Sequence, residues 1–351
     1  MKDDARLLVF QTAFPGDVVL ALPVVQALKK ALPRAHIGFV ATPAGASLLQ
    51  NHPAISSVLV FDKRGEDRGA AGLRRSAARL REEGFEVAVV PHRSIRSALV
   101  TALARIPRRI GFSTSAGRMF LTESVSYDRN AHEIDRNLSL LGPLGLTPGT
   151  RALPSLYPSC ADVAAVDTLI QSWHHRGGKS GRWVALAPGS VWATKRWPAA
   201  HYVSLARMLV EKGRTAVIIG GAEDRPLGEQ IAGAVGGNSA LNAAGSLSLL
   251  QSAEFIRRCD LLVSNDSAPM HLAVAMRVPV VALFGPTIPA FGFAPLGASD
   301  IVLGLQGLRC RGCRIHGGPE CPVGTFECMI ALSPGEVFRA VESLLVHSSV
   351  G

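Results

Sequence analysis

The sequence has no hydrophobic run long enough to cross a membrane and no recognisable export signal. No stretch of its 351 residues reaches the roughly 18 uninterrupted apolar residues of a transmembrane helix. Acidic residues, Asp3 and Asp4, stand where a signal peptide would be basic, and no small-residue cleavage site follows. We therefore expect a cytoplasmic protein whose membrane contacts are peripheral.

Charged residues are also scarce, at 18% of the sequence, whereas hydrophobic residues make up 48%. This composition excludes a disordered chain and, at about 150 residues per domain, suffices for two buried cores. Acidic residues are the rarer charge: 27 Asp and Glu against 37 Lys and Arg leave a net charge of +10. Such an excess predicts an anionic partner, namely nucleic acid, a phosphorylated substrate or a membrane surface. No nucleic-acid recognition motif is present, so nucleic acid is not expected.

Two common phosphate-binding signatures are missing as well. No G-x-G-x-x-G follows an expected strand, which argues against a dinucleotide-binding dehydrogenase. The run Gly178-Lys179-Ser180 resembles the end of a Walker A loop, but its first glycine would fall on Trp173. A P-loop nucleotidase is therefore not supported either.

What the sequence does contain is an alternation of short apolar runs and amphipathic stretches, which predicts βαβ units and parallel sheets. The strands expected from this alternation are 6–13, 36–41, 58–61, 87–91, 183–187, 215–221, 260–264 and 279–284. The helices expected are 18–32, 72–83, 200–212, 247–258 and 269–276.

A polar, Gly-rich and basic stretch, 172–182, separates the two halves of this pattern and is typical of a linker. We therefore expect an α/β protein of two doubly wound, Rossmann-like domains, 1–172 and 183–351, joined by a linker at 173–182 and facing each other across a cleft.

Two polar loops follow expected strands in the second half, where ligands of such sheets bind. The first, Pro188–Pro198 (PGSVWATKRWP), offers hydroxyl groups and a point charge. The second, Asn265–His271 (NDSAPMH), begins a helix that Ser267 can cap, with its free amides facing an anion. Asp266 would repel a phosphate, so it orients the loop or accepts from a hydroxyl. Each residue alone could be a cap or a solvated charge, but the two loops together favour a nucleotide diphosphate site.

The segment Phe14-Pro15-Gly16-Asp17 joins the first expected strand to the first expected helix. From these residues alone, Asp17 is best explained as a helix N-cap. The functional alternative makes it a carboxylate that deprotonates an incoming hydroxyl, with a pKa lowered by the helix dipole and raised by burial.

Five segments resemble glycosyltransferase family 9, the lipopolysaccharide heptosyltransferases, and occur in that family's order: GDVVLALPVVQALKKALP, VPHRSIRSAL, ARIPRRIGF, PGSVWATKRWP and SNDSAPMHLAVAMRVPVVALFGPT. The resemblance covers nearly the whole chain, and NDS-x-x-MH followed by FGPT is its most specific part. It implies a GT-B fold, with the acceptor-binding domain first and the nucleotide-sugar domain second. Ala268-Pro269 departs from the Gly-Leu that the family often has there.

The resemblance implies that heptose is transferred from ADP-heptose to the inner core of lipopolysaccharide (Kdo-lipid A or heptosyl-Kdo-lipid A), with inversion. It implies Asp17 as general base and Lys195 as the residue that contacts the donor diphosphate. The full set of donor-binding residues expected is Ser190, Thr194, Lys195, Asp266, Ser267, Ala268 and His271. No metal ion is required, because Lys195 and helix amides can stabilise the leaving diphosphate.

Arginines are concentrated in the first half, and their planar fork suits the phosphates and carboxylates of a lipid A core. The acceptor-binding residues expected are Gly16, Arg93, Arg96 and Arg109. Expected partners are therefore ADP-heptose, a lipid A-core glycolipid and an anionic inner-membrane surface. Three alternatives stay open: a family 9 transferase with another nucleotide sugar or acceptor, a GT-B-fold sugar-nucleotide epimerase, and a non-catalytic anion-binding module.

Four of the six cysteines form the pattern Cys310-x2-Cys313-x7-Cys321-x6-Cys328, here named the cysteine segment. The first pair has zinc-like spacing, and the second is looser than in a zinc ribbon. A reducing cytoplasm argues against two disulfides. A structural zinc site and free thiols packed in a loop are the two alternatives.

Overall fold

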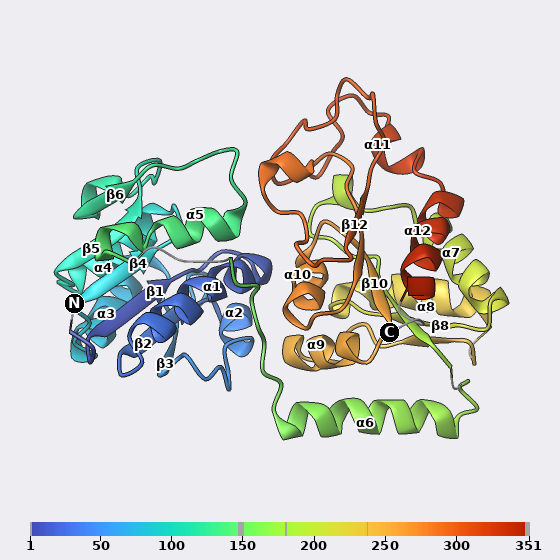
Figure 1. Cartoon of the computed structure of the whole chain (residues 1–351), viewed down its shortest axis with the longest axis horizontal. Helices are drawn as coiled ribbons and strands as arrows, with labels where there is room; N and C mark the ends of the chain where they lie inside the picture. The colour runs from blue at the N-terminus through green and yellow to red at the C-terminus, as the bar shows by residue number, and fades with distance from the viewer. Residues whose placement is uncertain (1, 147–150, 180, 237, 348–351) are drawn as a thin grey trace. The chain divides into compact units, whose positions relative to one another are not determined.

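The computed structural model describes residues 2–146, 151–179, 181–236 and 238–347. It divides into two compact units, Met1–Tyr157 and Pro158–Gly351, and each forms around its own sheet (Figure 1). No helix among the described residues is both long enough and apolar enough to span a membrane.

The first unit contains a six-stranded parallel sheet in the order β3-β2-β1-β4-β5-β6. Its strands are β1 (Arg6–Phe10), β2 (His36–Ala41), β3 (Ser57–Val60), β4 (Val87–Val90), β5 (Arg108–Phe112) and β6 (Glu123–Val125). Its helices are α1 (Pro15–Ala31), α2 (Pro43–Ser47), α3 (Gly69–Glu82), α4 (Ile95–Leu103) and α5 (Glu133–Ser139), with short 3-10 turns η1 (Arg118–Phe120) and η2 (Gly142–Leu144). Helix α1 packs against α5, and α3 packs against α4.

The second unit contains another six-stranded parallel sheet, in the order β12-β11-β10-β7-β8-β9. Its strands are β7 (Trp183–Ala187), β8 (Thr215–Ile218), β9 (Ala240–Asn242), β10 (Leu261–Asn265), β11 (Val280–Leu283) and β12 (Ile301–Leu303). Its helices are α6 (Cys160–His175), α7 (Ala199–Glu211), α8 (Arg225–Val235), α9 (Leu249–Arg257), α10 (Ala268–Ala275), α11 (Glu327–Ile330) and α12 (Pro334–His347). Three 3-10 turns complete it: η3 (Ala193–Lys195), η4 (Ala222–Asp224) and η5 (Pro289–Phe291).

The two sheets have the same doubly wound order, since β9-β8-β7-β10-β11-β12 repeats the first sheet's β3-β2-β1-β4-β5-β6. In such sheets ligands bind beyond the carboxyl ends of the strands, at the point where the strand order reverses. That point lies between β1 and β4 in the first unit and between β7 and β10 in the second. The predicted α/β class with two parallel sheets is confirmed.

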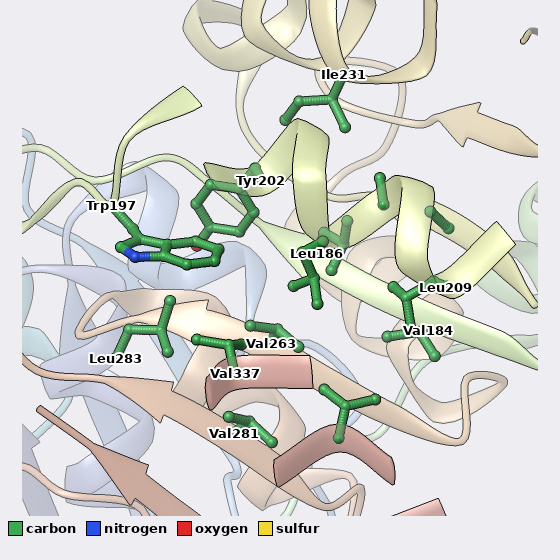
Figure 2. Packing of buried hydrophobic residues seen from close by; sticks show 14 of the residues in the cluster. Val184, Leu186, Trp197, Tyr202, Leu209, Ile231, Val263, Val281, Leu283 and Val337 are labelled. Atoms are coloured by element: carbon green, nitrogen blue, oxygen red, sulfur yellow. The ribbon is translucent and has the colours of Figure 1, made fainter. Parts of the chain in front are cut away.

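The core of the second unit shows why its central strands are almost wholly apolar. Alternate residues of neighbouring strands, among them Val184, Leu186 and Val281, are completely buried. Figure 2 shows them packing with side chains of α7 and α12 on one face of the sheet. Burying each such side chain stabilises the fold by about 1.5–3 kcal/mol, and a sheet covered on both faces needs continuous apolar strands.

Helix α6 belongs to the second unit, so the units divide at Tyr157 and Pro158, ahead of the segment 173–182 in which we expected a linker. Trp173, near the end of α6, is buried and lies edge-on against Trp183 of β7, with ring centroids 6.0 Å apart. Indole packing of this kind explains why the helix stays with the second sheet. Ser180, within the expected linker, lies outside the described residues.

The start of α1 corrects one local prediction. Asp17 is not the N-cap: Phe14 occupies that position, and Asp17 is the third residue of the helix. Pro15 takes the first helical position, where its missing N–H costs nothing, and so the helix begins earlier than expected.

Candidate active site

The two predicted donor loops lie together because β7 and β10 are neighbouring parallel strands. Asn265, which begins the second loop but was not among the expected donor-binding residues, joins them. Its side-chain N–H donates to the Pro188 carbonyl at 2.8 Å, and its Oδ1 accepts the Trp197 N–H at 3.1 Å. Asn265 is completely buried, so these bonds replace water for both loops. The signal available in the sequence was an amide side chain at the carboxyl end of an otherwise apolar strand.

An ion pair also crosses between the donor loops. Lys195 Nζ lies 2.7 Å from Asp266 Oδ2 and 3.2 Å from the Asp266 carbonyl oxygen. The side chains are only 12% and 7% exposed, respectively. A buried pair of this kind gains little net stability, but each charge becomes costly if its partner leaves. Lys195 is therefore a cation already fixed at the end of the sheet.

The helix start after β10 differs from its prediction in one respect. Ser267 is at the N-cap position of α10, but its side chain does not cap the helix. Instead its Oγ donates to the Asn265 carbonyl at 3.3 Å. The expectation that Ser267 caps α10 is therefore wrong. In the first turn Pro269 has no N–H and the Met270 N–H donates to the Ser267 carbonyl at 3.2 Å, so Ala268 carries the first-turn amide that can meet another acceptor. His271 lies within α10 and is buried.

Thr194 and Ser190 come from the loop after β7. The Thr194 hydroxyl is engaged within the chain: it donates to the Gly318 carbonyl at 2.9 Å and accepts the Gly318 N–H at 2.8 Å. Thr194 thus holds the loop rather than offering its hydroxyl to a ligand. Ser190 is half-buried, and its carbonyl accepts the Arg196 Nε–H at 2.8 Å.

Acidic residues after β8 were missed by the sequence analysis. Asp224 Oδ2 accepts the Gly221 N–H at 3.0 Å, and a Cβ on Gly189 would come within 2.3 Å of the Asp224 carboxylate. Burial raises the pKa of Asp224, as does nearby Glu223. In dinucleotide-binding Rossmann units an acidic residue after the second strand binds the ribose, and this position was the signal available in the sequence.

In the first unit, Asp17 and Gly16 lie in the first turn of α1, after β1. Asp17 is half-buried, and its Oδ2 accepts the Phe14 N–H at 3.1 Å. Lys63, missed by the sequence analysis, lies within electrostatic range of Asp17 and donates from Nζ to the Thr12 carbonyl at 2.6 Å. Burial and two neighbouring arginines lower the pKa of Lys63, whereas Asp17 raises it.

A neutral network joins the ends of β1 and β4. His92 Nδ1 lies 2.9 Å from both Thr12 Oγ1 and Ser97 Oγ. Burial, with Lys63 and Arg93 adding to it, lowers the pKa of His92 to about 4. The imidazole is therefore uncharged near neutral pH and ties the two strand ends together.

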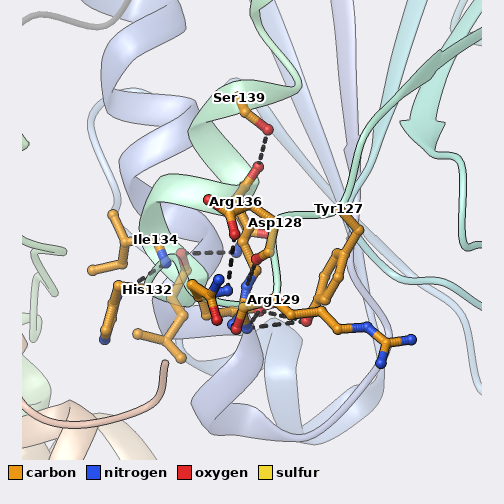
Figure 3. A network of polar contacts seen from close by, with 11 residues as sticks. Tyr127, Asp128, Arg129, His132, Ile134, Arg136 and Ser139 are labelled. Atoms are coloured by element: carbon orange, nitrogen blue, oxygen red, sulfur yellow. Dashed lines mark hydrogen bonds and ion pairs between the residues drawn. The ribbon is translucent and has the colours of Figure 1, made fainter. Parts of the chain in front are cut away.

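Arg93 follows directly and is exposed, with its guanidinium 4.2 Å from the centre of the Tyr127 ring. Behind Tyr127 is the polar network of Figure 3, in which nearly buried Arg136 donates to Tyr127 Oη at 3.0 Å and to Glu133 Oε2 at 2.9 Å. Arg136 also donates to the Asp128 carbonyl at 2.7 Å. This network fixes the ring on which Arg93 stacks.

The other two predicted acceptor arginines, Arg96 and Arg109, lie in different surroundings. Arg96 is exposed in the first turn of α4 and acts electrostatically on Lys63. Arg109 lies at the amino end of β5, where its guanidinium donates to the carbonyls of Phe120 at 2.7 Å and Ile106 at 2.5 Å. Because Asp17 and His92 follow the opposite, carboxyl ends of their strands, Arg109 is not brought together with them.

The four cysteines of the cysteine segment line one pocket, together with Thr194. None is in a disulfide. Burial raises the pKa of Cys328 to about 11, and the other three thiols add to the shift. No three His, Cys, Asp or Glu side chains of the described residues already stand in the arrangement of a metal site.

Residues 73–320 match the sequence model of glycosyltransferase family 9 (heptosyltransferase). The chain belongs to this family. It is 26% identical to lipopolysaccharide heptosyltransferase 2 of Salmonella typhimurium over 353 residues, covering 98% of this chain and 100% of that protein. It is equally identical, at 26%, to the same enzyme of Escherichia coli K12, over 97% of this chain and 99% of that protein.

Solved structures agree with these sequence relationships. A family 9 glycosyltransferase from Veillonella parvula superposes with a TM-score of 0.87 at 26% identity, over 99% of both chains. The E. coli ADP-heptose lps heptosyltransferase II superposes with a TM-score of 0.79 at 25% identity, over 98% of this chain and 99% of that one. The expected GT-B fold and the expected heptosyltransferase class of enzyme are both confirmed.

Proposed function

We propose that this family 9 enzyme transfers heptose from ADP-heptose to the inner core of lipopolysaccharide, with inversion at the anomeric carbon. The observation that carries the donor half is the buried Lys195–Asp266 pair at the amino end of α10. A lysine and a helix N-terminus at one strand-order reversal make a site for a diphosphate. The names of the similar enzymes supply the sugar and the acceptor.

On the donor side, Lys195 exchanges its bond to Asp266 for one to the diphosphate. The backbone N–H groups of Ser267, at the N-cap, and of Ala268, at the first position of α10, receive the phosphate oxygens, with His271 and Ser190 at the edge of the site. Glu223 and Asp224, after β8, are suited to the ribose hydroxyls. Negative charge develops on ADP as its bond to the sugar breaks. Lys195 is a fixed cation and stabilises this developing charge.

On the acceptor side, Asp17 acts as the general base. It takes the proton of the acceptor hydroxyl as that oxygen bonds to the anomeric carbon and ADP departs from the opposite face. The proton ends on Asp17 and the electron pair of the broken bond on ADP. The cysteine segment has a structural role in this proposal. A zinc ion bound by its four thiolates would have no open coordination position for a substrate.

The acceptor itself is anionic, and Gly16, Lys63, Arg93 and Arg96 are the residues we propose to meet it. Arg93 and Arg96 are exposed, and each basic residue near an anionic membrane contributes about 1 kcal/mol of attraction. We accordingly propose a cytoplasmic enzyme that works peripherally at the inner membrane.

Thermal-shift measurements with ADP, UDP, GDP and their sugar conjugates test the donor assignment. We expect ADP and ADP-heptose to raise the unfolding temperature, because a ligand that binds only the folded state stabilises it by mass action. Transfer to a lipid A-core acceptor, followed by mass spectrometry, tests the reaction. Stabilisation by uridine nucleotides alone would overturn the choice of donor.

A further inference from the structure

Three of the four cysteines of the cysteine segment lie in a long stretch without helix or strand, and the fourth, Cys328, lies in α11. Residues 304–326, between β12 and α11, contain neither helix nor strand. Irregular stretches longer than about 15 residues within a compact domain are uncommon and are usually either functional loops or disordered linkers. Part of this stretch is already anchored, because Arg311, between the first two cysteines, donates to the carbonyls of Phe284 at 3.2 Å and Leu305 at 2.9 Å.

The middle of the same stretch touches the donor loop directly. Beyond the two side-chain bonds of Thr194 to Gly318, the Thr194 N–H donates to the Gly318 carbonyl at 3.1 Å. Gly317 has a φ of +79°, and a Cβ there would lie 3.0 Å from Cγ of Lys195. The turn that carries Lys195 is thus held by residues between Cys313 and Cys321.

The four thiols surround one pocket with Thr194 in its wall. They come from both sides of the Gly317–Gly318 turn: Cys310 and Cys313 precede it, and Cys321 and Cys328 follow it. A single ligand bound by both pairs would close the turn into a loop fixed at its two ends.

We propose that the four cysteines bind one zinc ion as thiolates, and that this ion holds the Gly317–Gly318 turn against Lys195. The four sulfurs move together on binding, to about 2.3 Å from the metal. Each thiol loses its proton as its bond to zinc forms, so binding releases protons and strengthens with pH. The metal takes no part in glycosyl transfer. The expected effect of the metal on ADP binding rests on the proposed function, whereas the metal site itself does not.

Metal analysis of the purified full chain tests the site itself. We expect about one zinc per chain, as for a closed tetrathiolate site. The double variant Cys313→Ser/Cys321→Ser should lose it, while Cys160→Ser, an exposed thiol outside the cluster, should keep it. Cobalt(II) loaded in place of zinc should show the thiolate charge-transfer absorption of a tetrahedral site. A chain that carries no zinc and takes up neither metal overturns the proposal, whether or not the cysteine variants fold.

Calorimetric titration with ADP tests the connection to the donor loop. Removing zinc with a chelator should weaken ADP binding about tenfold, the equivalent of one charge-assisted hydrogen bond, and restored zinc should reverse the loss. Gly317→Ala should weaken ADP binding with zinc retained. Gly307→Ala is the matched control, since its φ of +74° is similar and nothing lies within 4 Å of its Cβ position.

Unchanged ADP affinity in the zinc-free chain and in Gly317→Ala overturns the connection, even if zinc binds. If the zinc-loaded wild-type chain fails to bind ADP at all, the proposed donor is wrong, while the metal content still decides the metal site.

Discussion

The two units have the same strand order but build different surfaces where that order reverses. In the second unit the strand ends are joined by buried Asn265 and by the ion pair of Lys195 with Asp266, so charge is compensated and shielded from water. In the first unit the strand ends are joined by the neutral His92 network, next to which Arg93 stands exposed. One topology therefore supports a buried, compensated ion pair in the second unit and an exposed cationic edge in the first.

The charge of the molecule follows the same division. The first unit holds 21 Lys and Arg against 13 Asp and Glu, whereas the second holds 16 against 14, so +8 of the net +10 belongs to the first. A small ligand such as the proposed nucleotide diphosphate is recognised by a few fixed groups, and the second unit offers such groups in Lys195 and Asn265. A large anionic glycolipid is attracted over a wide surface, and exposed charges serve that purpose.

The largest effect should come from the general base. Asp17→Asn should lower kcat about 1,000-fold, within the range for removing a positioned base, and should leave ADP affinity unchanged. Initial rates measure kcat, and calorimetry measures the ADP affinity separately. Asp135→Asn, which breaks a partly exposed pair with Arg151, is the control and should keep its activity. Transfer at the parent rate by a folded Asp17→Asn chain would remove Asp17 from the mechanism.

The second largest effect should fall on the other unit. Lys195→Ala should weaken ADP binding about 100-fold and also destabilise the fold, since Asp266 is left buried without its cation. Adding Asp266→Asn should restore stability but not ADP affinity, and this split separates the structural role of the pair from its binding role. Lys212→Ala, at an exposed position, is the control. If the double variant recovered ADP affinity as fully as stability, Lys195 would not be a donor-binding residue.

A third test concerns pH, since burial lowers the pKa values of His52 and His92, both in the first unit, to about 4. The unfolded chain binds their protons near pH 6.5, so stability is present above that pH and is lost as the pH falls toward 4. For each histidine, the free energy of unfolding should fall by about 2 kcal/mol as the pH is lowered from 7.5 to 5. Chemical denaturation at several pH values measures this. His52→Phe should flatten the dependence, and an unchanged slope would show that His52 titrates normally.

Much of this fold could be predicted from local pattern. The strand ranges 36–41 and 183–187 match β2 and β7, because apolar runs between turn signals are sufficient for buried parallel strands. Strand β5 was not expected, since two of its five residues are arginines. The position of Asp17 could have been deduced from Pro15, whose preference for the first helical position puts the N-cap one residue earlier.

The site was harder to predict than the fold because its decisive contacts are non-local. Thr194 was expected to face the donor, but its hydroxyl bonds Gly318, which is far away in sequence. Arg109 and Arg93 were grouped because both are arginines in one region. Only the strand register shows that Arg109 lies at the amino end of β5, whereas Arg93 follows the carboxyl end of β4. The residue types indicated the chemistry of the site, and the strand topology decided which of those residues lie at the same end of the sheet.

The smallest effect should come from the exposed edge of the first unit. Arg93→Ala should raise the KM for a lipid A-core acceptor about fivefold to tenfold, with the ADP affinity unchanged, because a solvated arginine contributes about 1 kcal/mol to an anionic surface. The increase should shrink at high salt, since exposed charges are screened over roughly 10 Å at 0.1 M. Arg109→Ala is the matched control, because its guanidinium is bound to backbone carbonyls at the other end of its strand. If Arg109→Ala raises the acceptor KM as much as Arg93→Ala does, acceptor binding is not confined to the carboxyl edge, and the contrast between the two units loses its basis.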